Sequence, residues 1–194
     1  MGFSREQLEA ARDRTVPDLV GPDLRLLFIG INPGLWTAAA GAHFAHPGNR
    51  FYKALHAAGI ILPESLDVSE GFTEVAVAAL LDRGLGITNL VDRATARADE
   101  LTTDELREGA RRLVEKVGRW RPKVAAVVGI TAYRTAFGRG DAAVGRQEED
   151  LAGAELWALP NPSGLNAHYR LIDLARLYRE AAAAAGVELG PMRR

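Results

Sequence analysis

The chain has 194 residues, of which 47% are hydrophobic and 25% charged, and its formal net charge is −1. This composition is typical of a globular protein, and we expect one domain over residues 1–194, with a helix and lead-in at about 1–20 and a tail at about 187–194. The chain has no cysteine, which excludes disulfides, thiolate zinc sites, iron–sulfur clusters and a cysteine nucleophile. No apolar run approaches the roughly 20 residues of a membrane span, so we expect a cytoplasmic protein.

Helical and strand patterns alternate along the chain. Continuous apolar and β-branched runs predict four strands, at 25–31, 86–93, 123–130 and 155–160. Capping boxes, helical periodicity and glycine stops predict helices at 5–13, 49–59, 74–84, after Thr102, at 131–138 and from Ala167 to Gly186. Residues 33–48 and 138–150 show no clear period and are predicted to be loops.

This alternation favours a parallel sheet with helices on both faces. We therefore predict an α/β fold, a three-layer α/β/α arrangement around a central, mostly parallel sheet of four or five strands. In such sheets ligands bind outside the carboxyl ends of the strands. Three predicted strands end in or just before a polar residue, namely Asn32, Asp92 and Asn161. These side chains are the first candidates for a functional site.

Common nucleotide, metal and hydrolase motifs are not found in the sequence. The GINPG stretch at 30–34 does not form G-x-G-x-x-G, and no P-loop pattern occurs. His43 and His46 have no third ligand at metal-binding spacing, so no metal site is expected. A dyad of Ser163 and His168 stays open as an alternative, although NPSGL lacks the first glycine of a G-x-S-x-G nucleophile turn.

Asn32 places an uncharged amide on a rigid turn between a strand and a proline. An ordinary turn is one interpretation, because Asn and Gly are common turn residues. A binding role is favoured by the second Asn-Pro turn at Asn161 and by the aromatic side chains Trp36 and Phe44 in the intervening loop. A ring to stack on and an amide with both donor and acceptor suit a flat heterocycle.

Four short motifs follow one another along the chain: GINPG at 30–34, FAHPGNRF at 44–51, LVDR at 90–93 and NPSGL at 161–165. Together they resemble the mismatch-specific uracil/thymine DNA glycosylases, within the uracil-DNA glycosylase superfamily, over about residues 24–180. The resemblance implies a parallel sheet between helices, no metal and no cofactor. It also implies removal of uracil, and in some members thymine or damaged pyrimidines, from DNA. The expected partner is double-stranded DNA with a G:U or G:T mismatch. The protein is expected to act as a monomer and not to bind a membrane.

The resemblance also implies roles for individual residues. Asn32 resembles the asparagine that positions the attacking water. Phe44 resembles the ring that stacks on the flipped base, and Thr37 the side chain that meets the 5-position of the pyrimidine. The base pocket is expected to comprise Gly30, Ile31, Thr37, Phe44 and Asn161. The DNA-binding loop, with Leu165 as the wedge that fills the gap left by the base, is expected to comprise Ser163, Gly164, Leu165, Asn166, His168 and Arg170.

The chain departs from the family pattern after NPSGL, where Asn166 and Ala167 stand in place of Ser-Arg. The arginine that would help to hold the orphaned guanine is thus missing from its usual place. Asn166, His168 and Arg170 are the candidates to replace it. Tolerance of bases other than guanine opposite the lesion is therefore expected.

A carboxylate is expected to assist Asn32, because an amide is no base near neutral pH. Asp92 is the candidate, since it follows a predicted strand on the same edge, and it could activate water or stabilise a cationic sugar. A salt bridge or a turn cap is the alternative role for Asp92. A second function also stays open, that of a non-catalytic module that binds flipped or abasic DNA, although such a module needs no water-positioning amide.

Overall fold

The computed structural model describes residues 2–61, 66–164, 166 and 168–193. Its centre is a five-stranded sheet in the order β2-β1-β3-β5-β4. The strands are β1 (Leu26–Gly30), β2 (Leu85–Asn89), β3 (Val124–Val128), β4 (Gly145–Leu151) and β5 (Ala154–Leu159). All neighbours pair in parallel except β4, which pairs antiparallel with β5 at one edge.

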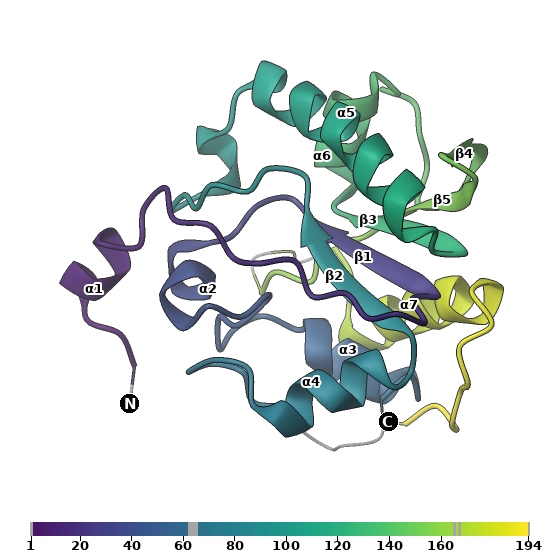
Figure 1. Ribbon diagram of the computed structural model, residues 1–194, viewed down its shortest axis with the longest axis horizontal. Coiled ribbons are helices and arrows are strands. Elements are labelled where there is room, and N and C mark those ends of the chain that lie inside the picture. The colour runs from purple at the N-terminus through teal and green to yellow at the C-terminus, as the bar shows by residue number, and fades with distance from the viewer. Residues whose placement is uncertain (1, 62–65, 165, 167, 194) are drawn as a thin grey trace.

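Helices cover both faces of the sheet (Figure 1). One face carries α3 (Phe51–Ala57), α4 (Glu74–Leu81) and α7 (Leu171–Ala184), and the other carries α5 (Thr103–Trp120) and α6 (Ile130–Phe137). The short elements are α1 (Arg5–Glu9), α2 (Leu35–Ala40) and the 3-10 turn η1 (Ala98–Glu100). The predicted three-layer α/β/α fold with a mostly parallel sheet is confirmed. Among the described residues, no helix is both long enough and apolar enough to cross a lipid bilayer.

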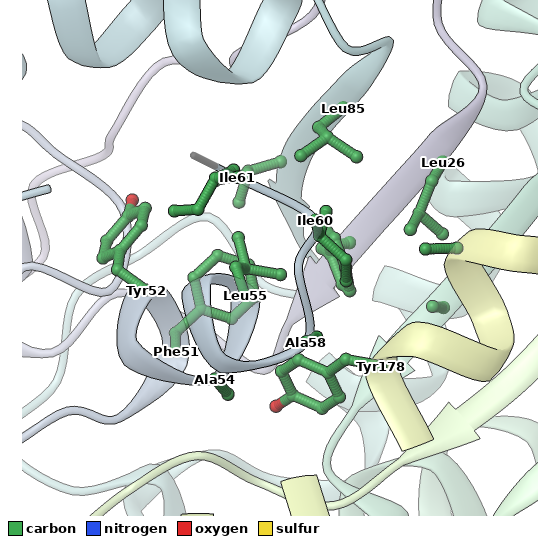
Figure 2. Close-up of a cluster of buried hydrophobic side chains, with 14 of the residues drawn as sticks. Leu26, Phe51, Tyr52, Ala54, Leu55, Ala58, Ile60, Ile61, Leu85 and Tyr178 are labelled. Carbon is green, nitrogen blue, oxygen red and sulfur yellow. The ribbon is translucent and has the colours of Figure 1, made fainter. Parts of the chain in front are cut away.

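The strands bury alternate side chains in two cores, one on each face. In β1, Phe28 packs into the core under α3, α4 and α7, whereas Leu27 and Ile29 pack into the core under α5 and α6. Because both faces are covered, the strand reads as a continuous apolar run. Figure 2 shows the first core, where Leu55 of α3 lies among side chains from the sheet and Tyr178 of α7.

Two of the predicted loops contain secondary structure. Residues 33–48 include α2, a six-residue helix that ends at Gly41 in the left-handed conformation. Residues 138–150 include most of β4, an edge strand whose charged, exposed side chains hide the alternation expected of a strand. The long predicted helix at 5–13 is also shorter, since α1 ends at Glu9.

The end of β2 differs from its prediction in a way that matters for the site. The strand ends at Asn89, not near Asp92, because Asn89 pairs with Gly30, the last residue of β1. Beyond Gly30 the segment after β1 turns at Pro33, which has no N–H for a regular ladder, and an isolated parallel bridge joins Gly34 to Thr95. Asn89, rather than Asp92, therefore stands at the carboxyl edge of the sheet.

Candidate active site

A cavity of about 510 Å³ lies at the carboxyl ends of the parallel strands. This volume is typical of a small-molecule site. Asn32 follows β1, Asn89 ends β2, Val128 ends β3 and Asn161 follows β5, and all four line the cavity. The other lining residues are Ile31, Gly34, Thr37, Phe44, His46, Gly48, Asn49, Thr95, Ala96, Ala98, Ser163 and Gly164.

The amide nitrogen of Asn32 is held by three oxygen atoms. Nδ2 donates to the carbonyls of Pro33 (3.2 Å) and Arg93 (3.0 Å) and to Thr95 Oγ1 (2.8 Å). Carbonyl oxygens only accept, so this contact set fixes which end of the amide is nitrogen. The Thr95 hydroxyl donates to the Arg97 carbonyl at 2.7 Å and therefore offers Asn32 a lone pair. Oδ1 of Asn32 lies on the opposite side of the amide, and no described residue donates to it.

The turn that carries Asn32 is fastened to the segment after β2. Val91 N donates to the Ile31 carbonyl at 2.9 Å, and Thr95 N donates to the Pro33 carbonyl at 3.1 Å. Pro33 also has a fixed φ, which removes most alternative turn geometries. The amide is therefore mounted on backbone that is restrained on both sides.

Arg93 ties this same segment to the start of α5. Its Nε lies 2.5 Å from Glu105 Oε1, and its Nη1 lies 3.2 Å from Asp13 Oδ1. Glu105 also accepts from Thr102 N at 2.9 Å in the cap of α5. Hydrogen bonds from Arg93 and then Thr102 lower the pKa of Glu105 to about 2. The Arg93 carbonyl, which accepts a hydrogen bond from Asn32, thus belongs to a residue whose side chain is held by ion pairs.

Asn89 is a second amide in the cavity, which the sequence did not reveal because β2 was predicted to run on to Asp92. Its Nδ2 lies 3.3 Å from His43 Nδ1, and His43 Nε2 lies 2.9 Å from the Pro17 carbonyl. Since the carbonyl accepts, Nε2 carries the proton and Nδ1 accepts from Asn89. Burial lowers the pKa of His43 and favours this neutral form.

The Asn89 oxygen is fixed by the same contacts. With Nδ2 directed at His43, Oδ1 lies next to Gly30, where an added Cβ would come within 2.4 Å of it. Gly30 does not line the cavity itself, and its lack of a side chain makes room for Asn89. Four asparagines line the cavity, and two of them, Asn32 and Asn89, are each held by the amide nitrogen.

Phe44 forms an aromatic wall of the cavity. Its ring stacks on buried Phe51 with centroids 4.0 Å apart and planes at 22°. Phe51 meets Phe28 edge-on at 5.1 Å and 89°, which ties the stack to β1. One face of Phe44 is thus covered, and a flat ligand would meet the other. Phe44 has φ 55°, a left-handed conformation that costs a non-glycine residue about 1–2 kcal/mol.

The NPSG turn after β5 closes the cavity on another side. Asn161 Oδ1 accepts from Ser163 N at 2.9 Å, and the Asn161 carbonyl accepts from Asn166 Nδ2 at 2.9 Å. Ser163 and Gly164 line the cavity beside Asn161. The predicted wedge, Leu165, lies outside the described residues.

His168 and Arg170 are exposed and do not line the cavity. Arg170 Nε lies 3.1 Å from Asp173 Oδ2 in the cap of α7, so its guanidinium is already paired. Ala167, the position of the departure from the family pattern, lies outside the described residues. A role for Asn166, His168 or Arg170 toward an orphaned guanine stays a prediction.

Asp92 lies on the α5 side of the sheet edge and does not line the cavity. Its Oδ1 is 3.4 Å from Lys116 Nζ, and its Oδ2 is 3.8 Å from Arg112 Nη1. Lys116 also lies 3.0 Å from Asp18 Oδ2 and 3.1 Å from Thr88 Oγ1. These contacts favour the salt-bridge interpretation of Asp92 over the catalytic role predicted from the sequence, and the activity of an Asp92 variant decides between the two.

Two histidines, His43 and His46, are engaged in hydrogen bonds near the cavity. His43 contacts Pro17 and Asn89, and His46 Nδ1 accepts from Gly48 N at 3.0 Å. Within the described ranges, no three His, Asp or Glu side chains are placed to hold one metal ion.

Comparison with known proteins identifies a family and a shared fold. The family model described as the uracil DNA glycosylase superfamily matches residues 17–184, which include all five strands. Among solved structures, the chain is similar to the solution NMR structure of "a putative Uracil DNA glycosylase from Methanosarcina acetivorans". The TM-score is 0.54 and the identity 16%, over 87% of this chain and 98% of that chain. An identity this low shows a shared fold alone.

Proposed function

Because the chain belongs to the uracil DNA glycosylase superfamily, we propose that it hydrolyses the N-glycosidic bond of uracil flipped out of mismatched double-stranded DNA, leaving an abasic site. The orientation of Asn32 carries this proposal. Three oxygens hold its amide nitrogen, so that Oδ1 is the acceptor available in the cavity. A purely structural turn residue would need no such exposed, fixed acceptor.

A fixed acceptor can orient a water molecule. A water that donates one hydrogen to Asn32 Oδ1 keeps a lone pair that can be directed at the anomeric carbon of the sugar. The amide cannot take up the proton, so its contribution is positioning rather than base catalysis. The proton that water loses on bonding to the anomeric carbon passes to solvent or to the departed uracil anion, so the products are neutral uracil and an abasic sugar. The glycosidic bond loosens first, through an oxocarbenium-like sugar, and main-chain N–H groups at the oxygens of the departing base stabilise its negative charge.

Asn89 supports uracil as the substrate base. One hydrogen of its amide nitrogen is donated to His43, which fixes the amide and leaves its oxygen as an acceptor for a base edge. Uracil and thymine present an N3–H donor, which pairs with this oxygen, whereas the N3 lone pair of cytosine would face it unpaired. Phe44 is proposed to stack on the base, and Thr37, which is buried and lines the cavity, is proposed to meet its 5-position.

The mismatch preference belongs to the same proposal. Extruding a base costs a few kcal/mol and least at a mismatch, so a G:U pair is favoured over A:U. Leu165 is proposed as the wedge that replaces the lost stacking, and Ser163 as a phosphate contact. The protein is proposed to act as a monomer without a metal or cofactor.

The experiment uses purified protein and duplexes that carry one U:G, T:G or C:G pair, with no added metal. We expect uracil release and an alkali-labile abasic site, little release of cytosine, and a loss of about 100-fold or more in Asn32→Ala. Tight binding to the U:G duplex without base release would instead identify a non-catalytic DNA-binding module.

A further inference from the structure

One arginine holds the loop that follows β5. Arg50, which precedes α3, donates from Nη1 to the Tyr169 carbonyl at 2.7 Å. Its Nη2 donates to the carbonyls of Ser163 at 3.0 Å and Asn166 at 2.9 Å. Its backbone N–H donates to the Pro162 carbonyl at 3.0 Å. A single residue thus binds four carbonyl groups of the 162–169 segment.

Ion pairing is not what holds Arg50 in this place. Among the described residues, no carboxylate lies within salt-bridge distance of its guanidinium, and its buried Nε has no hydrogen-bond partner. Its bonds are charge-assisted, and they use the planar donor fork that distinguishes Arg from Lys. The contacts of Arg50 are therefore those of a residue that fixes the conformation of the main chain.

The loop before α3 and the loop after β5 also touch directly. A Cβ on Gly164 would lie 2.8 Å from the Gly48 carbonyl oxygen, so the approach requires glycine. The loop before α3, residues 44–49, carries Phe44, whose ring lines the cavity. Arg50 directly follows this loop and is therefore a common anchor for both segments.

We propose that Arg50 is a positioning residue that joins the base-stacking loop (44–49) and the described residues of the duplex-entering loop (161–164, 166 and 168–170) into one rigid unit. The inference rests on the proposed function, because it takes the second loop to enter DNA. A loop that displaces a base must keep its conformation when it enters the duplex. A loop that is already ordered avoids the entropic cost of becoming ordered on binding DNA. Arg50 also satisfies three carbonyl oxygens of the second loop with hydrogen bonds.

The variant Arg50→Lys keeps the charge but replaces the planar fork by one ammonium group, which cannot span the three carbonyls. Arg179→Lys is the matched control. Arg179 Nη1 likewise donates to two carbonyls, of Ala58 at 2.6 Å and Gly190 at 2.7 Å, and none of these residues lines the cavity. Arg50→Met removes all of the side-chain hydrogen bonds. If Arg50→Met does not fold, Arg50→Lys alone is compared with the unmodified protein.

The first readout is the single-turnover rate on two duplexes. One has uracil opposite guanine, and the other has uracil opposite a tetrahydrofuran abasic analogue, where no base pair must open. We expect Arg50→Lys to lose about tenfold or more on the first and less than about threefold on the second, since about 1.4 kcal/mol corresponds to tenfold. Arg179→Lys should show the same ratio between substrates as the unmodified protein. Equal losses on both duplexes, or no loss on U:G, would overturn the assignment.

The second readout is independent of activity. Amide hydrogen exchange without DNA should become faster in both loops, 44–49 and 161–170, in Arg50→Lys, and in the C-terminal tail instead in Arg179→Lys. Unchanged exchange in both loops would refute the anchor. Faster exchange together with an unmodified protein that releases no uracil would leave the anchor in place and refute the proposed function.

Discussion

The held amide of Asn32 makes a specific prediction for Asn32→Asp. Aspartate is nearly isosteric but has no N–H. One carboxylate oxygen would take the place of Nδ2, facing the carbonyls of Pro33 and Arg93 at 3.2 and 3.0 Å. The Thr95 hydroxyl could turn toward it only by giving up its bond to the Arg97 carbonyl.

The magnitude follows from these contacts. A lost hydrogen bond costs about 1 kcal/mol, and more where the remaining partner stays unsatisfied. Asn32 is half-buried, so water can replace part of the loss in Asn32→Ala, and we expect a decrease in the free energy of unfolding of about 2 kcal/mol. Aspartate adds repulsion between an anion and two carbonyl oxygens, so we expect about 4 kcal/mol at neutral pH.

The difference between the two variants should depend on pH. The carbonyls raise the pKa of the introduced carboxyl in the folded state above its unfolded value of about 3.9. The folded state then binds the proton more tightly, so the stability of Asn32→Asp falls as pH rises from about 4 toward the folded pKa. Below about pH 4 the protonated acid can donate to one carbonyl, and its deficit should approach that of alanine.

Urea unfolding of the unmodified protein and both variants, at about pH 4 and about pH 7, measures these free energies. Asn32→Ala is the control for loss of the side chain without a charge. An aspartate variant as stable as the unmodified protein at neutral pH would contradict the reasoning, since Nδ2 would then not be the atom that is held. Oδ1 would in that case not be the cavity acceptor.

Three further variants test other parts of the site. In Gly30→Ala the new Cβ would lie 2.4 Å from Asn89 Oδ1. We expect Asn89 to be displaced, with a loss of about 1–3 kcal/mol in urea unfolding and lower uracil kcat/KM, and a crystal structure with Asn89 unmoved would contradict this. His43→Phe removes the hydrogen-bond acceptor for Asn89. We expect the free energy of unfolding, measured by thermal denaturation, to fall by about 1–3 kcal/mol, and the preference for uracil over cytosine to weaken. An unchanged preference would count against the role assigned to Asn89. The stabilisation from Glu105, whose pKa falls from 4.5 to about 2, is present above pH 4.5 and lost as pH falls toward 2. Glu105→Gln should therefore flatten the acid dependence of the urea midpoint, and parallel curves would show that the contact with Arg93 does not stabilise the fold.

The sequence indicates strand ends where the chain itself marks them. Pro33 and Pro160 lie just after β1 and β5 and cannot donate to a regular ladder, so polar residues at those two ends could be predicted. Nothing local marks the end of β2, because the apolar residues Leu90 and Val91 follow Asn89 directly. That end is set by the length of β1, whose last residue pairs with Asn89.

Other features that the sequence did not predict also depend on contacts between residues far apart in the chain. The bond from Asn32 to Thr95 joins residues 63 positions apart and leaves no local pattern. The edge strand β4 is held by pairing with β5 rather than by its own charged sequence. The two-core α/β fold, in contrast, was readable from apolar runs that are long enough to fill both faces of the sheet.

The role of Asn32 is tested most directly by single-turnover uracil release from a U:G duplex, measured in parallel for Asn32→Ala and Asp92→Asn. We expect Asn32→Ala to lose about 100-fold or more. Asp92→Asn should stay within about threefold of the unmodified protein, the effect of an exposed ion pair, because Asp92 faces Lys116 and Arg112 rather than the cavity. Full activity in Asn32→Ala, or a larger loss in Asp92→Asn than in Asn32→Ala, would contradict this assignment.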